Sequence, residues 1–220
     1  MESAVPVQST RMDAMYRYTR HVYDLSRKCY LLGRDRLIHE MEPTDGAQIL
    51  EMGCGTARNL RKIHRRYPTC KLFGLDASSV MLETAEKSID RAGAAAAVQL
   101  QQELAENLDY TRTFNCDRPF DVIFFSYSIS MIPTWQEAID AALRNLSHDG
   151  TIWIVDFWDQ AGWSRWFRAL LRKWLAMHSV YFRQEVLQYL EALQADGRIT
   201  YEVNDISRRY AYLAKIKPTT

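Results

Sequence analysis

The sequence has few cysteines and almost no net charge. Its 220 residues include four cysteines, which are irregularly spaced without a C-x-x-C pair, so neither a disulfide framework nor a zinc site is indicated. The 28 Lys and Arg residues nearly balance the 27 Asp and Glu residues, for a formal net charge of +1. A chain that attracts nucleic acid through the field of the whole molecule is therefore excluded, and any attraction to phosphate must come from a local patch.

Long apolar runs are absent as well. No segment approaches the roughly 20 apolar residues that a membrane-spanning helix requires, and the first residues do not form a charged start before an apolar run. We therefore expect a chain of the reducing cytosol that is neither secreted nor transmembrane, while attachment to a membrane surface stays open. The 47% of hydrophobic and 25% of charged residues are typical of a soluble globular protein.

Short apolar segments alternate with amphipathic segments through the middle of the chain. We expect strands at residues 48–52, 71–75, 98–101, 120–126 and 151–156. Helical patterns separate them, the last from about Trp135 to Leu146, and this alternation predicts a doubly wound, Rossmann-like α/β sheet, mostly parallel, with helices on both faces. Two β-like runs near 199–206 and 209–216 predict a C-terminal antiparallel hairpin at the sheet edge.

A glycine-rich loop follows the first expected strand. Glu51-Met52-Gly53-Cys54-Gly55 lies before a helix, where glycine lets a ligand approach the backbone and the helix N-terminus is electropositive. Asp76 ends the next strand, 21 residues beyond Gly55, and a carboxylate there can accept hydrogen bonds from both hydroxyls of a ribose. The two features predict a nucleoside-binding unit. Arg58 stands where a dinucleotide fingerprint has a third small residue, which argues against a nicotinamide-dependent oxidoreductase.

The loop resembles the first motif of class I S-adenosylmethionine-dependent methyltransferases, acidic-x-Gly-x-Gly-x-Gly, with Ala57 in place of the last glycine. Segments Leu75–Ser78, Glu103–Leu108 and Phe120–Ser126 are also similar to that family. The resemblance implies an enzyme that uses S-adenosylmethionine as its cofactor. We expect no metal site.

By this resemblance the backbone of Gly53 and Gly55 borders the amino-acid part of the cofactor, Asp76 holds the ribose, and Leu104 and Ala105 meet the adenine. The cofactor-binding residues that we expect are Tyr23, Arg34, Glu51, Gly53, Cys54, Gly55, Asp76, Ala77, Gln102, Glu103, Leu104, Ala105 and Ser126.

Three tyrosines recur at a spacing of seven residues near the N-terminus. On a helix, Tyr16, Tyr23 and Tyr30 share nearly one face with Met12. Such a stripe is either core packing or the lining of a pocket. Aromatic faces stabilise a sulfonium donor and a methylated ammonium product, so a tyrosine pocket suits methyl transfer to nitrogen.

Residues 12–38 resemble the opening of the bacterial betaine-lipid N-methyltransferases, and residues 125–133 and 155–162 are similar to the same family. Those enzymes methylate diacylglyceryl-homoserine three times to give the trimethylated lipid, which is the function that the resemblance implies here. We expect catalytic roles, including proton relay, for Tyr16, Tyr23, Tyr127 and Asp159, with His21 as an alternative base. The expected substrate-binding residues are Tyr16, Tyr30 and Trp158.

An independent pattern also indicates lipid. A helical wheel of residues 163–177 gathers Trp163, Trp166, Phe167, Leu170, Trp174 and Met177 on one face and Arg165, Arg168 and Arg172 on the other. No acidic residue lies between Asp159 and Glu185. An aromatic face opposite a basic face is typical of a helix that lies in the bilayer interface, although the same face can also pack on the sheet. We therefore expect a lipid substrate, a peripheral membrane position at the cytoplasmic inner leaflet, and no nucleic acid.

These patterns predict a single domain with three parts. Residues 1–46 form an N-terminal helical extension with a break at Gly33, residues 47–160 form the cofactor-binding core, and residues 161–220 hold the amphipathic helix, a further helix near 183–194 and the hairpin. Two other functions stay open. One is methylation of a soluble amine or a quinone-like acceptor, and the other is a binding protein that senses S-adenosylmethionine without turnover.

Overall fold

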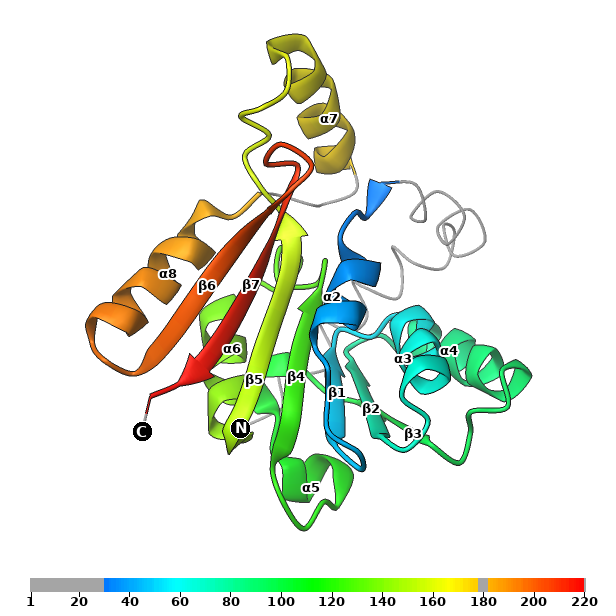
Figure 1. Ribbon diagram of the computed structural model, residues 1–220. Coiled ribbons are helices and arrows are strands. Elements are labelled where there is room, and N and C mark those ends of the chain that lie inside the picture. Colours follow the sequence, from blue (N-terminus) through cyan, green and yellow to red (C-terminus); the bar gives the residue numbers. More distant parts are fainter. Residues whose placement is uncertain (1–29, 178–181, 220) are drawn as a thin grey trace, which may run out of the picture.

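The computed structural model describes residues 30–177 and 182–219 of the chain (Figure 1). Within these residues one sheet contains the strands β1 (Gln48–Met52), β2 (Lys71–Asp76), β3 (Val98–Gln102), β4 (Phe120–Ser126), β5 (Leu146–Phe157), β6 (Ile199–Ile206) and β7 (Ala211–Pro218). Their order across the sheet is β3-β2-β1-β4-β5-β7-β6. The first five strands are parallel, and β7 is antiparallel to both β5 and β6. The predicted fold class is confirmed, including the C-terminal hairpin.

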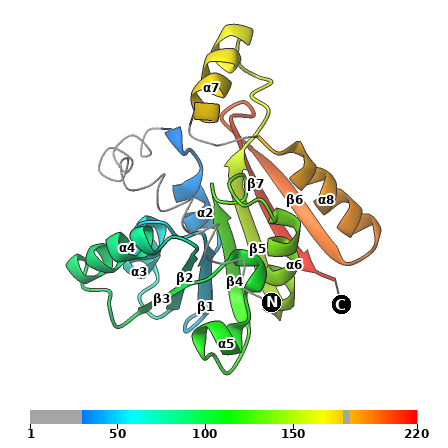
Figure 2. The same cartoon turned by 180° about the vertical axis from the view of Figure 1, so that it is seen from behind.

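Helices cover both faces of the sheet. The described helices are α2 (Arg34–Glu40), α3 (Arg58–Arg66), α4 (Ser79–Arg91), the single 3-10 turn η1 (Ala105–Asn107), α5 (Tyr110–Phe114), α6 (Trp135–Arg144), α7 (Arg165–Met177) and α8 (Gln184–Ala195). Helices α2, α3 and α4 pack on one face, and α5, α6 and α8 pack on the other (Figures 1 and 2).

The central strand β4 shows why the core has two halves. Successive side chains of a strand point to opposite faces, so Phe124 joins the cluster under α2, α3 and α4, and Phe125 joins the cluster under α6 and α8. Both side chains are fully buried. A strand with helices on both sides therefore reads as a continuous apolar run, as the sequence of β4 does.

Strand and helix ends differ from the prediction mainly around residue 146. The expected helix ends earlier, at Arg144, and β5 begins at Leu146, which pairs with Phe120 across a shift in register. The turn-like residues that precede Thr151 therefore belong to the strand. The sequence also did not predict α5, which Asp109 caps by accepting hydrogen bonds from the backbone N–H groups of Thr111 and Arg112.

Only the last part of the expected N-terminal extension falls within the described residues. Helix α2 begins directly after Gly33, where the break was predicted. Met12, Tyr16, His21 and Tyr23 lie outside the described residues.

Helix α7 follows the carboxyl end of β5 and stands away from the sheet, beside the turn that joins β6 to β7 (Figure 1). None of the helices in the described ranges is both long and apolar enough to cross a bilayer.

Candidate active site

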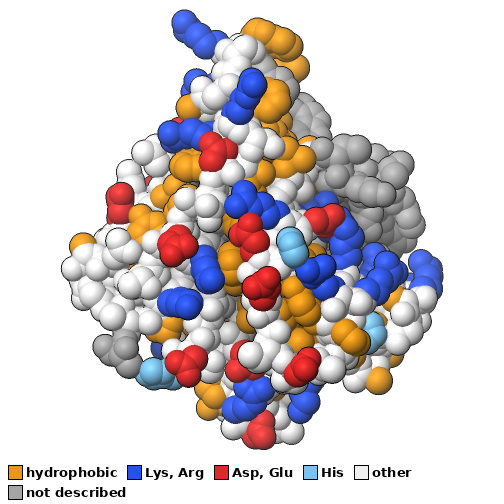
Figure 3. Space-filling view, in the orientation of Figure 1, with side chains coloured by type: hydrophobic (Ala, Val, Ile, Leu, Met, Phe, Trp, Pro, Cys, Tyr) orange, Lys and Arg blue, Asp and Glu red, His pale blue; other side chains and the backbone are white. Residues whose placement is uncertain are grey.

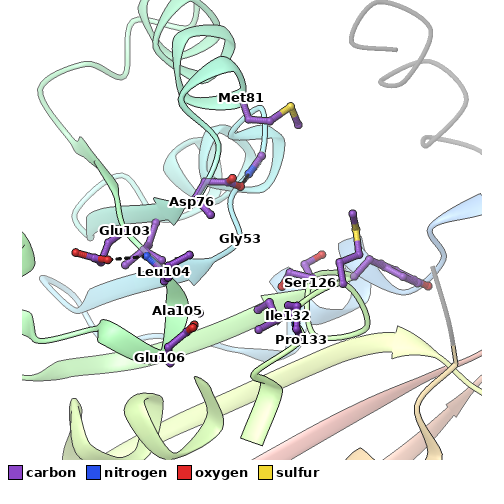
Figure 4. Close-up of a pocket in the computed structure, with 16 residues that line it drawn as sticks. Gly53, Asp76, Met81, Glu103, Leu104, Ala105, Glu106, Ser126, Ile132 and Pro133 are labelled. Carbon is purple, nitrogen blue, oxygen red and sulfur yellow. Dashed lines mark hydrogen bonds between the residues drawn. The ribbon is translucent and has the colours of Figure 1, made fainter. Parts of the chain in front are cut away.

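A cavity opens where β1, β2 and β4 end (Figure 4). Together with its open mouth it encloses about 670 Å³, within the range of small-molecule sites. Its lining residues are Gly53, Gly55, Leu75, Asp76, Ala77, Met81, Glu103, Leu104, Ala105, Glu106, Ser126, Tyr127, Ser128, Met131, Ile132 and Pro133. Carboxyl ends of parallel strands at a change of strand order are the usual ligand site of open α/β sheets.

The Asp76 carboxylate ties the glycine loop to the start of α4. It accepts hydrogen bonds from the backbone N–H of Gly55, at 2.8 Å, and from that of Ser78, at 2.9 Å. The backbone N–H groups of Gly53 and Cys54 both donate to the carbonyl of Leu75. The loop is therefore held against the end of β2, and the carboxylate is fixed at the cavity wall.

Gly53 is the tightest point of the loop. Its φ of +78° lies in the left-handed region, and a Cβ placed on it would lie 2.6 Å from the Cβ of Ser128. Ser128 donates a hydrogen bond of 2.6 Å from its Oγ to the carbonyl of Met52. Ser128 thus clamps the segment after β4 onto the glycine loop. Ser128 is not among the residues predicted for the site, because a serine between apolar residues carries no distinctive sequence signal.

Glu51 lies behind the loop and is only 2% exposed. Its Oε1 accepts a hydrogen bond of 2.7 Å from Nδ2 of Asn59, whereas its Oε2 is buried without a hydrogen-bond partner among the described residues. Burial raises the pKa of Glu51 to about 8, against the hydrogen bond from Asn59 and the positive charge of Arg34. The structure therefore holds a buried carboxyl group that readily takes up a proton and whose Oε2 has no hydrogen-bond partner among the described residues.

The cavity wall formed by Leu104 and Ala105 is apolar. Leu104 and Ala105 are nearly buried in the lining. The Glu103 carboxylate accepts from the backbone N–H of Leu104 and from Nδ2 of Asn107, so it is turned toward its own segment. Gln102 donates to the carbonyl of Ala77 and does not line the cavity.

Tyr127 lines the cavity with its phenol already engaged. Its φ is +56°, and its hydroxyl donates a hydrogen bond of 2.6 Å to the carbonyl of Leu32. Burial raises the pKa of Tyr127 well above its usual value, so the phenol stays neutral. Its ring packs edge-on against Phe157, with centroids 4.7 Å apart.

The other expected acceptor-site residues in the described chain do not line the cavity. Asp159 forms an ion pair with Arg209 at 2.5 Å, and the Arg209 guanidinium lies over the ring of Trp158, 4.5 Å from its centroid. Tyr30 stacks on Phe157. The structure thus brings most of the predicted cofactor residues together, with Arg34, Glu51 and Cys54 buried behind them. Trp158 and Asp159 lie instead in residues 158–164, the segment between β5 and α7, which we call the foot of α7.

Helix α7 combines a packed edge with an exposed edge. Leu171 packs against the buried cluster under α2, α3 and α4. Trp166 and Leu170 are 71% and 60% exposed, and Trp163, just before the helix, is 37% exposed. Arg165 is exposed and Arg168 is half-buried. The side chains of Phe167, Arg172 and Trp174 lie outside the described set.

Comparisons with known proteins agree on the core of the chain. Residues 49–150 match the family model described as "Methyltransferase domain". A trans-aconitate 2-methyltransferase of Streptomyces avermitilis is 30% identical over 114 residues, and this alignment covers 50% of the present chain but only 39% of that protein.

Two solved structures have similar folds at low sequence identity. The methyltransferase partner in a complex with the Haloferax volcanii activator Trm112 superposes with a TM-score of 0.74 at 15% identity and covers 94% of this chain and 99% of its own. The plantazolicin methyltransferase BpumL, solved with S-adenosylhomocysteine (SAH), gives a TM-score of 0.68 at 17% identity and covers 97% of this chain and 94% of its own.

Proposed function

We propose that this chain, a class I S-adenosylmethionine-dependent methyltransferase, transfers three successive methyl groups to the amine of diacylglyceryl-homoserine to form the betaine lipid diacylglyceryl-trimethylhomoserine. The observation that carries the proposal is the position of α7. The helix follows the carboxyl end of β5, at the same sheet edge as the cavity, and exposes Trp166 and Leu170 there. If α7 binds a lipid surface through these side chains, that surface lies beside the bound cofactor.

The cavity residues fit S-adenosylmethionine. The fixed Asp76 carboxylate suits a pair of ribose hydroxyls, and the apolar surface of Leu104 and Ala105 suits the adenine ring. Once Glu51 is ionised, its buried Oε2 accepts a hydrogen bond from an α-ammonium group, directly or through a water molecule. When bound, the cofactor supplies a methyl group on a positively charged sulfur.

The described residues act on the acceptor mainly by orientation and by exclusion of water. Attack on a methyl group requires a neutral amine in line with the carbon–sulfur bond, so the acceptor loses one proton for each methyl group it gains. Water accepts this proton, and no strong base is obligatory. Burial keeps the Tyr127 phenol neutral, and its hydroxyl already donates a hydrogen bond to the carbonyl of Leu32, so Tyr127 does not act as a base. Asp159 is committed to Arg209. Roles for Tyr16, Tyr23 and Tyr30 around the amine remain part of the proposal, as does a peripheral position on the cytoplasmic face of the membrane.

A soluble acceptor is the second candidate. The curated relative is named for methylation of trans-aconitate, a small carboxylate, and this name supports an acceptor that is not a lipid. In that case α7 serves as a cover for the acceptor pocket, and binding to vesicles is not expected.

Mass spectrometry of lipids tests the proposal directly. The purified chain is incubated with S-adenosylmethionine and diacylglyceryl-homoserine in mixed micelles, and stepwise gains of one, two and three methyl groups are expected. Absence of methylated lipid, together with cofactor binding measured by calorimetry, would overturn the lipid substrate. Turnover of soluble amines or carboxylates would then support the second candidate, and absence of any turnover would indicate a sensor of S-adenosylmethionine.

A further inference from the structure

The turn between β6 and β7 has an unusual backbone. Ser207, Arg208 and Arg209, which we call the hairpin tip, have successive φ values of 54°, 58° and 61°. Residues other than glycine, asparagine and aspartate rarely adopt this left-handed backbone conformation, because their Cβ crowds the following carbonyl. Three such residues in a row store strain, and strain of this kind persists where the surrounding structure imposes it.

Contacts from residues 159–163, in the segment before α7, impose the conformation of the hairpin tip. Nε1 of Trp163 donates a hydrogen bond of 2.9 Å to the carbonyl of Ser207. The carbonyl of Arg209 accepts a hydrogen bond from the backbone N–H of Gln160, and the guanidinium of Arg209 forms an ion pair with Asp159. Gly162 approaches so closely that a Cβ on it would lie 2.6 Å from Cβ of Arg208. The tip and the foot of α7 therefore form one unit.

Arg208 differs from the rest of this unit. Its side chain is exposed, and no described residue forms a hydrogen bond or ion pair with its guanidinium. Arg209, by contrast, forms an ion pair with Asp159, and its guanidinium lies over the ring of Trp158. The strained turn thus holds one cation at the surface beside Trp163, where asparagine or glycine would fit the backbone with less strain.

The surroundings of Arg208 are basic and apolar together. Arg165 and Arg168 lie on α7, and Trp166 and Leu170 expose apolar surface on the same helix. The space-filling view has Lys and Arg side chains and hydrophobic side chains together over α7 (Figure 3). The acidic groups near the tip are Asp159, which is paired with Arg209, and Asp205, which accepts a hydrogen bond from the backbone N–H of Arg209. A free phosphate needs no apolar surface, whereas an anionic bilayer offers phosphate and hydrocarbon side by side.

We propose that the hairpin tip binds lipid phosphate, with Arg208 as the contact residue, on an anionic phospholipid surface that also receives the exposed edge of α7. The proposal rests on the proposed function for the placement of α7 on lipid. It adds a second element, far along the chain, that fixes the helix to the headgroup layer.

Vesicle sedimentation with matched variants tests the proposal. Vesicles of phosphatidylcholine with or without phosphatidylglycerol are titrated with the wild type, Arg208→Gln, Arg208→Lys and Lys217→Gln, which removes an exposed cation at the opposite end of the hairpin. We expect Arg208→Gln to weaken binding to anionic vesicles about fivefold, since one cation near the surface contributes about that factor. Arg208→Lys keeps most of the affinity, and Lys217→Gln leaves it unchanged. Equal losses in Arg208→Gln and Lys217→Gln, or no loss in Arg208→Gln, would overturn the assignment.

A second variant separates binding from folding. Arg208→Asn removes the charge and also suits a left-handed φ, so we expect a higher melting temperature together with weaker binding to anionic vesicles. A fall in both quantities would assign a structural role to Arg208 instead. Because these vesicles contain no amine acceptor, the test is independent of turnover. Vesicle binding that depends on Arg208 without methylated lipid would contradict only the proposed substrate, whereas methylated lipid with vesicle binding indifferent to Arg208 would contradict only the tip assignment.

Discussion

The two ends of the carboxyl edge of the sheet use their polar groups in opposite ways. At β1 and β2, hydrogen bonds from backbone N–H groups hold the glycine loop to the Asp76 carboxylate and to the carbonyl of Leu75, and Gly53 leaves no room for a Cβ beside Ser128. At β5 and β7, the hairpin tip and the foot of α7 are also joined by hydrogen bonds, yet Arg208 of the tip and Trp166 and Leu170 of α7 are exposed. The first end encloses a cavity of small-molecule size, and we propose that the second end contacts a lipid surface. Three variants and one titration test this difference between the two ends.

The largest effect is expected from Gly53→Ala. The new methyl group meets Ser128 at a distance that real Cβ atoms do not tolerate, and the backbone φ of +78° adds strain. We expect cofactor affinity, measured by calorimetry, to fall by more than about 100-fold, or about 3 kcal/mol. Gly46→Ala is the matched control, because Gly46 has a φ of +74° but nothing within 4 Å of its added Cβ. A similar loss of affinity in both variants would mean that backbone strain, rather than contact with Ser128, disturbs the site.

Asp76→Asn should have the next largest effect. The amide keeps one acceptor oxygen but loses the charge and the second acceptor that now bind Gly55 and Ser78. We expect cofactor affinity to fall about 30-fold, which corresponds to about 2 kcal/mol for a lost charge-assisted hydrogen bond. Asp90→Asn, at an exposed position of α4, serves as the control. Unchanged affinity in Asp76→Asn would remove Asp76 from ribose binding.

Leu170→Glu probes the other end of the edge. Leu170 is 60% exposed, so we expect the melting temperature to change little, while a charge on the apolar edge opposes insertion into lipid. Ala169→Glu adds the same charge at the neighbouring exposed position on the basic side of α7. Affinity for anionic vesicles should fall about tenfold more in Leu170→Glu than in Ala169→Glu, as for the loss of one buried leucine side chain. Equal losses would reduce the role of α7 to charge alone.

The same contrast explains what could be predicted from the sequence. The cofactor end depends on local signals: apolar strands, glycines at the strand-to-helix turn, and an aspartate at the end of the next strand, so that residues near in sequence are near in space. The bond from Ser128 to Met52 joins residues 76 positions apart, and that from Tyr127 to Leu32 joins residues 95 positions apart. Such long-range bonds have no local signature.

At the α7 end, the amphipathic pattern predicted the helix but not its surroundings. Asp159 pairs with Arg209, which lies 50 positions further along the chain. We expected Asp159 near the acceptor, but this ion pair gives it a structural role. The strained backbone of the hairpin tip could not be predicted either, because Ser-Arg-Arg lacks the glycine or asparagine that usually marks a left-handed turn. Its conformation follows from contacts with Trp163 and Gly162, which only the folded chain brings together.

The smallest effect concerns the proton on Glu51. Burial raises its pKa from 4.5 to about 8, so between these values the folded chain holds a proton that the unfolded chain has released, and stability falls as pH rises through this window. A cofactor that carries positive charge favours the ionised carboxylate, so binding releases the proton. Cofactor affinity should therefore rise about threefold per pH unit between pH 6 and pH 8, below the tenfold limit for one proton.

Calorimetry in buffers of different ionisation enthalpy measures the release of this proton. In Glu51→Gln the dependence on pH should shrink to that of the cofactor's own amino group, and stability should become flatter with pH. An unchanged profile in Glu51→Gln would show that the unpaired Oε2 does not sense the cofactor. The enclosed end of the sheet edge would then bind its ligand through the glycine loop and Asp76 alone.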